Sequence, residues 1–221
     1  MLGWLRQSLR RRRYRQICRE RIAMRFPLIQ RDLDAAEPGF ALVLGDSHAE
    51  FLCAHPLGPR PVVNGGVGGI GIGGYAARLP ELYVPRRAGV AVMILGSNDL
   101  SVRTRPLSSE GIARFEAAAL ALMRWLRTHA DRVVVLALPP IDQVPGQERE
   151  TKAVEEYSAR LERLAAETGC GFADPFSELR EGSGWPAEAL AKGLAKPGAL
   201  SDGVHLADYG AVAKHMGALL A

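Results

Sequence analysis

This sequence contains few cysteines, and their arrangement does not suit a fold held together by disulfide bonds. The 221 residues include three cysteines, Cys18, Cys53 and Cys170, which lie far apart and form no CxxC pair. An odd number of cysteines at such spacings argues against a disulfide framework or a zinc site and favours a reducing compartment. The five histidines form no HExxH pattern, so we expect no metal site.

A long hydrophobic run is also missing. The longest stretch without a charged residue, residues 61–77, contains seven glycines and suits a loop better than a membrane span. Residues 2–9 are interrupted by Arg6, and no small-residue cleavage pattern follows them, so they do not resemble a secretory signal. The sequence therefore predicts a cytoplasmic protein, with peripheral attachment to a membrane as an open alternative.

Acidic residues are scarce at the N-terminus. Residues 1–25 contain nine arginines and a single acidic residue, Glu20, which gives this segment a charge of +8. Because the whole chain carries +4, the remaining 196 residues carry −4. The basic character thus belongs to one segment, and the mildly acidic remainder does not favour nucleic acid as a partner. We expect a basic helical arm over residues 1–37 and a single domain over residues 38–221.

Two interpretations of the arm are open. In the first, the arginines form a solvated basic helix that packs loosely on the domain. In the second, the helix lies at an anionic lipid surface, with Trp4 and nearby leucines dipping into it. No obligate protein partner is evident from the sequence.

Strand and helix patterns alternate after residue 38. Continuous apolar runs predict buried strands at residues 40–44, 61–63, 89–95, 132–138 and 171–173. Apolar residues at spacings of 3 and 4 predict helices over residues 112–126, 154–168 and 212–219. A further short helix is expected near residues 187–194. This alternation predicts an α/β fold, a parallel sheet covered by helices.

Polar residues gather at the ends of the predicted strands, where an open parallel sheet binds its ligands. The four segments are Gly45-Asp46-Ser47-His48, Asn64 to Gly69, Gly96-Ser97-Asn98-Asp99 and Asp202-Gly203-Val204-His205.

These residue types suit nucleophilic catalysis. A serine hydroxyl needs a neighbouring base, which His205 can supply to Ser47, while Asp202 fixes the tautomer of the imidazole. An oxyanion needs hydrogen-bond donors, and the backbone N–H groups of Ser47 and Gly66 and the side-chain amide of Asn98 are the candidates.

The four segments resemble the four blocks of the SGNH (GDSL-type) hydrolases: Gly-Asp-Ser, Asn-x-Gly, Gly-x-Asn-Asp and Asp-x-x-His, in that order. The resemblance covers residues 40–210. It implies a flavodoxin-like, three-layer α/β/α sandwich with five parallel strands in the order 2-1-3-4-5. It also implies a catalytic triad of Ser47, His205 and Asp202, an oxyanion hole of Ser47, Gly66 and Asn98, and acyl-ester hydrolysis without a cofactor.

Two departures from the family pattern stand out. The residue after Ser47 is usually leucine and is His48 here, a variant similar to SGNH domains associated with acylation of bacterial polysaccharides. His48 is interpreted as a local hydrogen-bonding residue or pocket wall, with a second base as the alternative. The second block is unusually rich in glycine, and a one-residue slip would place Gly65 in the donor position instead of Gly66.

The sequence therefore predicts a serine esterase or deacylase that acts on a small acylated substrate, such as an acetyl ester on a carbohydrate. Transfer of the acyl group to a sugar hydroxyl is the alternative, as is a non-catalytic, membrane-associated relative. A dinucleotide binder is disfavoured, because Gly66 to Gly71 matches GxGxxG but lacks the acidic residue about 20 positions later. An α/β-hydrolase is disfavoured, because its nucleophile normally follows several strands rather than the first.

Overall fold

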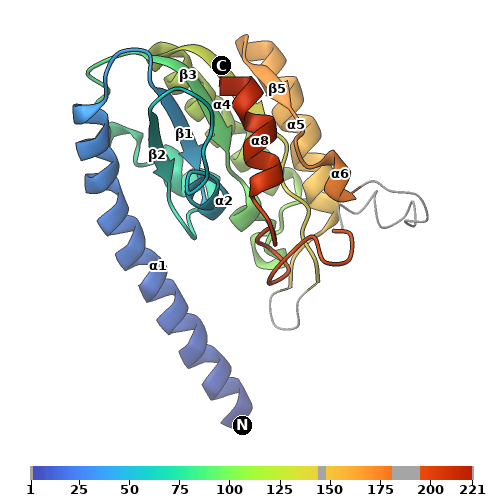
Figure 1. Cartoon of the computed structure of the whole chain (residues 1–221). Helices are drawn as coiled ribbons and strands as arrows, with labels where there is room; N and C mark the ends of the chain where they lie inside the picture. Colours follow the sequence, from blue (N-terminus) through green and yellow to red (C-terminus); the bar gives the residue numbers. More distant parts are fainter. Residues whose placement is uncertain (1, 144–147, 181–194, 221) are drawn as a thin grey trace.

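A computed structural model describes residues 2–143, 148–180 and 195–220 of the chain (Figure 1). Five parallel strands form one sheet in the order β2-β1-β3-β4-β5, which confirms the predicted order. The strands are β1 (Ala41–Gly45), β2 (Val62–Gly66), β3 (Ala88–Ile94), β4 (Ala130–Leu136) and β5 (Gly171–Ala173). The short helix expected near residues 187–194 lies outside the described residues.

The second strand is longer than its apolar residues predict. The prediction ended it at residue 63, whereas β2 continues through Asn64 and Gly65 to Gly66. Glycine has a low intrinsic preference for strands, but β-structure depends strongly on context. Here the parallel pairing with β1 extends to the pair Gly45 and Gly66, and this pairing outweighs the local preference.

Helices cover both faces of the sheet. The longer ones after the first strand are α4 (Ser109–His129), α5 (Lys152–Thr168) and α8 (Gly210–Leu220). The short ones are α2 (Ser47–Leu52), α3 (Ile72–Ala76) and α6 (Ser177–Arg180), with single 3-10 turns at Leu79–Glu81, Ser97–Leu100 and Val102–Thr104. One apolar cluster joins the sheet to α3, α4 and α5, and a second joins it to α2 and α8. Together they give the expected three layers.

The chain begins with α1 (Leu2–Ala35), whose two halves differ. Phe26, Ile29 and Leu33 in the second half are buried against the sheet. The first half points away from the domain (Figure 1). The division of the chain at residue 37 stays a prediction, but the last turns of α1 contribute to the core of the domain. None of the described helices combines the length and apolar character needed to cross a membrane.

Candidate active site

Ser47 begins α2 directly after the first strand. The preceding residue, Asp46, caps this helix: its carboxylate accepts hydrogen bonds from the backbone N–H groups of His48 at 3.0 Å and Ser97 at 3.2 Å. Asp46 is fully buried, and burial raises its pKa to about 6 despite these hydrogen bonds. Gly45 allows the tight approach of this turn to β3, because a Cβ atom there would lie 2.0 Å from the carbonyl oxygen of Ile94. The nucleophile candidate therefore stands on a turn anchored in the core.

The structure brings Ser47, His205 and Asp202 together. Nε2 of His205 lies 2.9 Å from Oγ of Ser47, and its Nδ1 lies 2.7 Å from Oδ2 of Asp202. The three side chains thus form the hydrogen-bonded chain that the sequence predicts.

The Asp202–His205 turn is held by its own backbone. Oδ1 of Asp202 accepts hydrogen bonds from the N–H groups of His205 at 2.8 Å and Val204 at 3.0 Å. Gly203 adopts a φ of +81°, a conformation that favours glycine. Partial burial works to raise the pKa of Asp202, but the hydrogen bonds from His205 and Val204 outweigh it and leave that pKa below its usual value. Asp202 is therefore an anion suited to orient the imidazole.

The ring of His48 lies near that of His205, with 5.6 Å between their centroids. The side chain of His48 is fully buried, and its Nδ1 is hydrogen-bonded to the hydroxyl of Tyr209 at 2.9 Å. Burial, together with the nearby His205 and Arg149, lowers the pKa of His48 to about 3, so the ring is neutral. This arrangement matches the interpretation of His48 as a local hydrogen-bonding residue.

The candidate oxyanion donors differ in what they already bind. Nδ2 of Asn98 donates one hydrogen bond to the carbonyl oxygen of Ile70 at 3.0 Å, which leaves its second hydrogen for another acceptor. Within the described residues, the N–H of Ser47 has no acceptor. The N–H of Gly66, in contrast, donates to Oδ1 of Asn64 at 2.9 Å. The predicted role of Gly66 as a donor is therefore not favoured by its geometry.

Gly66 has a different reason to be glycine. A Cβ atom at this position would lie 2.3 Å from the backbone nitrogen of Glu50, so the absence of a side chain at Gly66 allows β2 to approach α2.

The sequence analysis missed Gly69, whose N–H has no acceptor within the described residues. Gly69 has a φ of +82° in a turn closed by the bond from Ile70 N–H to the Val67 oxygen, as in a type II turn. Because this run contains several glycines, the sequence alone does not show that Gly69 is the one with a left-handed conformation.

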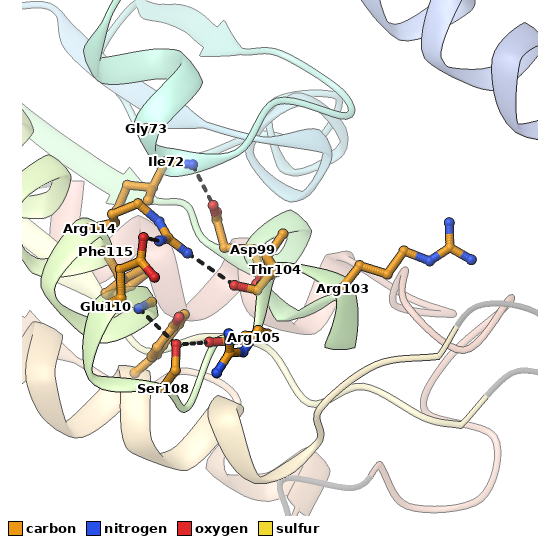
Figure 2. Close-up of a pocket in the computed structure, with 12 residues that line it drawn as sticks. Ile72, Gly73, Asp99, Arg103, Thr104, Arg105, Ser108, Glu110, Arg114 and Phe115 are labelled. Atoms are coloured by element: carbon orange, nitrogen blue, oxygen red, sulfur yellow. Dashed lines mark hydrogen bonds and ion pairs between the residues drawn. The ribbon is translucent and has the colours of Figure 1, made fainter.

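A cavity of about 340 Å³ lies beside this region (Figure 2). Its wall includes Asp99, whose Oδ2 accepts the N–H of Ile72 at 2.8 Å and whose pKa burial raises to about 7. Arg114 in the wall is paired with Glu110 at 2.8 Å, and Arg103 extends away from the other labelled side chains. Ser47, Asp202 and His205 do not line this cavity, so it is separate from the three candidate catalytic side chains.

Solved structures share the fold at low sequence identity. A protein from Streptococcus pneumonia matches with a TM-score of 0.75 and 16% identity, over 97% of this chain and 99% of that one. A GDSL-like lipase from Bacteroides thetaiotaomicron matches with a TM-score of 0.63 and 14% identity, over 88% and 96% of the two chains. An acetyl xylan esterase from Geobacillus stearothermophilus matches with a TM-score of 0.54 and 19% identity, over 82% and 91%.

The search of curated proteins found no match. Family assignment therefore rests on the family model, which covers the strands, the Ser47 turn and the Asp202–His205 turn. The GDSL-like lipase/acylhydrolase family model matches residues 31–213, more than four fifths of the chain, and the chain belongs to this family of hydrolases.

Proposed function

We propose that the protein is a serine esterase that hydrolyses a short-chain acyl ester through an acyl-enzyme on Ser47. The observation that carries this proposal is the hydrogen-bonded chain from Ser47 through His205 to Asp202. His205 accepts the proton of the hydroxyl as Oγ bonds to the ester carbonyl carbon, and it returns that proton to the departing alcohol. A water molecule then attacks the acyl-enzyme with the same base, which releases the acid and restores Ser47.

The tetrahedral intermediates need hydrogen-bond donors for their negative oxygen. The N–H of Ser47 and the second hydrogen of the Asn98 amide supply two of them. We assign the third to the N–H of Gly69, because the N–H of Gly66 is already donated to Asn64.

The surroundings of His205 support a small, polar alcohol component. His205 retains 28% of its side-chain exposure and Asp202 retains 55%, so the site lies at the surface. The rings of Phe51, which is exposed, and His205 form a T-shaped pair with 5.0 Å between centroids, and an aromatic side chain offers a flat apolar contact to a sugar ring. The acetyl xylan esterase among the structural neighbours is consistent with an acetylated carbohydrate as substrate.

The first experiment measures ester hydrolysis and labelling of the serine. Wild-type protein should release p-nitrophenol from p-nitrophenyl acetate and react with a fluorophosphonate probe. Ser47→Ala should lose both activities. Ser109→Ala, which changes an exposed serine at the start of α4, should keep both. Hydrolysis by Ser47→Ala at the wild-type rate would remove the proposal.

Acyl transfer is the second candidate, because the imidazole of His205 is partly exposed and a sugar hydroxyl could approach it in place of water. The two outcomes share the acyl-enzyme and differ only in the acceptor. Incubation with an acetyl donor and a glycan acceptor separates them. Release of free acetate supports hydrolysis, and acetylated glycan as the main product supports transfer.

The basic arm is proposed to contact an anionic membrane surface. Residues 1–25 of the arm carry a charge of +8, in contrast with the −4 of the remaining 196 residues. Each arginine near an anionic surface contributes about 1 kcal/mol. Replacing Arg10 to Arg13 by glutamine should therefore greatly weaken sedimentation with vesicles that contain an anionic lipid. Sedimentation with neutral vesicles serves as the control. Unchanged binding to anionic vesicles would refute this contact.

A further inference from the structure

Helix α1 contacts the glycine loop, which we define as residues 64–71. The guanidinium of Arg25 donates from Nε to the carbonyl oxygen of Gly66 at 3.0 Å and from Nη2 to that of Asn64 at 2.9 Å. Because β2 is an edge strand of the described sheet, these oxygens lie on its open side and have no strand partner among the described residues. Two bonds from one planar group fix both the position and the angle of this end of the strand.

A second contact reaches the loop through α2. Arg21 of α1 pairs with Oε1 of Glu50 at 2.7 Å. The other carboxylate oxygen of Glu50 accepts the N–H of Gly68 at 3.0 Å. Glu50 stands three residues after Ser47, so this chain of contacts joins α1, the helix of the nucleophile and the glycine loop.

A third contact lies at the turn of the loop. A Cβ atom on Gly69 would lie 2.8 Å from Sγ of Cys18, which shows how closely α1 approaches this residue. On the site side, Asn98 binds the carbonyl oxygen of Ile70. The loop is therefore held between α1 and the candidate oxyanion donor Asn98.

We propose that α1 positions the glycine loop for the reaction, with Arg25 as the main positioning residue and Arg21 acting through Glu50. This inference rests on the proposed esterase function. The contacts come from residues 18–25, which lie before residue 31, where the family match begins. Loss of the Arg25 contacts leaves the loop less well ordered, and an N–H of the loop is then less well aimed at the oxyanion.

The main test compares Arg25→Ala with Arg25→Lys and with Arg31→Ala. Arg31 is the matched control, because it lies on the same helix, is exposed and pairs only with its neighbour Asp32 in the described residues. Titration with the fluorophosphonate probe counts the competent sites in each preparation. The kcat for p-nitrophenyl acetate per titrated site then separates positioning from loss of folded protein.

We expect Arg25→Ala to lower kcat per site about tenfold, with KM changed less than about twofold, because the oxyanion forms only after binding. Arg25→Lys should recover part of the loss, since an ammonium can reach one carbonyl but cannot hold both. Arg31→Ala should match the wild type. If Arg25→Ala reduces only the number of titrated sites and leaves kcat per site unchanged, its role is structural and the proposal is overturned.

Hydrogen exchange separates this inference from the proposed function. If the wild type hydrolyses no ester, the esterase proposal fails, but the amides of residues 67–70 still report on the loop. Faster exchange of these amides in Arg25→Ala than in Arg31→Ala supports positioning, and equal exchange overturns it.

Labelling of Cys18 tests the same contact in protein that is already folded. Burial raises the pKa of Cys53 to about 12, and Cys170 is buried, so a maleimide should react first with Cys18. The label should lower kcat in the wild type and have no effect on Cys18→Ala. Full activity of protein labelled at Cys18 would contradict a role for the contact with Gly69.

Discussion

The two sides of the candidate site differ in how they are built. On the nucleophile side, Ser47 stands between Asp46 and His48, both fully buried at the end of a central strand. On the acid–base side, Asp202 and His205 keep 55% and 28% of their side-chain exposure on a loop before α8. The first side depends on the sheet and its core. The second depends on a local turn, in which the carboxylate of Asp202 holds two backbone N–H groups.

This difference separates stability from activity. Changes on the nucleophile side disturb buried hydrogen bonds and should affect folding. Changes on the acid–base side remove exposed groups, so they should affect turnover with little effect on folding.

The sharpest test of this separation is His205→Gln. Without the imidazole, Ser47 has no base, and we expect kcat to fall by about 10⁴-fold or more. The melting temperature should stay within a few degrees of the wild type, because the side chain is partly exposed. Steady-state kinetics and calorimetry check both. A large loss of stability with a small loss of kcat would reverse the comparison.

Asp202→Asn should give the next largest effect. The amide cannot balance the charge of the imidazolium, and we expect kcat to fall about 10³-fold. Water at this exposed position can solvate part of that charge, which keeps the loss below that of His205→Gln. Kinetics of the two variants side by side measure the ranking. An equal or larger loss of kcat for Asp202→Asn would show that solvent exposure of this position does not reduce the effect of the substitution.

Asn98→Ala should lower kcat by about 10²-fold, because one of several oxyanion donors is removed. KM for p-nitrophenyl acetate should change little, since the donor acts mainly on the transition state. Asn98→Asp gives a similar shape without the donor and should be at least as slow. Wild-type kcat in both variants would exclude Asn98 from the oxyanion site.

The smallest effect on turnover is expected for His48→Leu, whose main consequence is a change in acid stability. Burial lowers the pKa of His48 to about 3, below the value near 6.5 of an unfolded chain. As the pH falls below about 6.5, His48 is therefore protonated in the unfolded chain but stays neutral in the folded protein. The free energy of unfolding decreases as a result towards pH 3. The variant should lack this loss, which amounts to a few kcal/mol by pH 4.

Urea unfolding of His48→Leu and the wild type between pH 4 and pH 8 measures this difference. Asp46 acts in the opposite direction: because burial raises its pKa to about 6, its contribution falls as the pH rises from about 4 to 6. Asp46 is present in both proteins, so its contribution cancels in the comparison. The loss of the bond to Tyr209 adds a cost that does not vary in this range. A stability difference independent of pH would show that the ring is not held neutral by burial.

The sequence predicted the fold well because its signals were long and repeated. Continuous apolar strands and helices with regular spacing determine a parallel sheet, and the four-block resemblance supplied the strand order. Pairing with β1 extended β2 beyond its apolar residues, which local preference does not reveal. In the site, the spacing of Asp202 and His205 was informative because both belong to one turn.

The loop donors and α1 were less predictable. Choosing among the glycines requires knowing that the Asn64 side chain binds the Gly66 N–H and that Gly69 has a positive φ. Nor does the sequence distinguish Arg25 from the other eight arginines of residues 1–25, because charge alone does not show which side chain turns toward a strand.

The guanidinium of Arg25 has one further consequence, for the behaviour of the chain in concentrated solution. By binding the outward carbonyls of Asn64 and Gly66, it prevents a strand from another molecule from pairing with the edge strand β2. A chain that lacks residues 1–25 would leave these carbonyls of β2 free to pair with another strand. We therefore expect it to self-associate as its concentration rises.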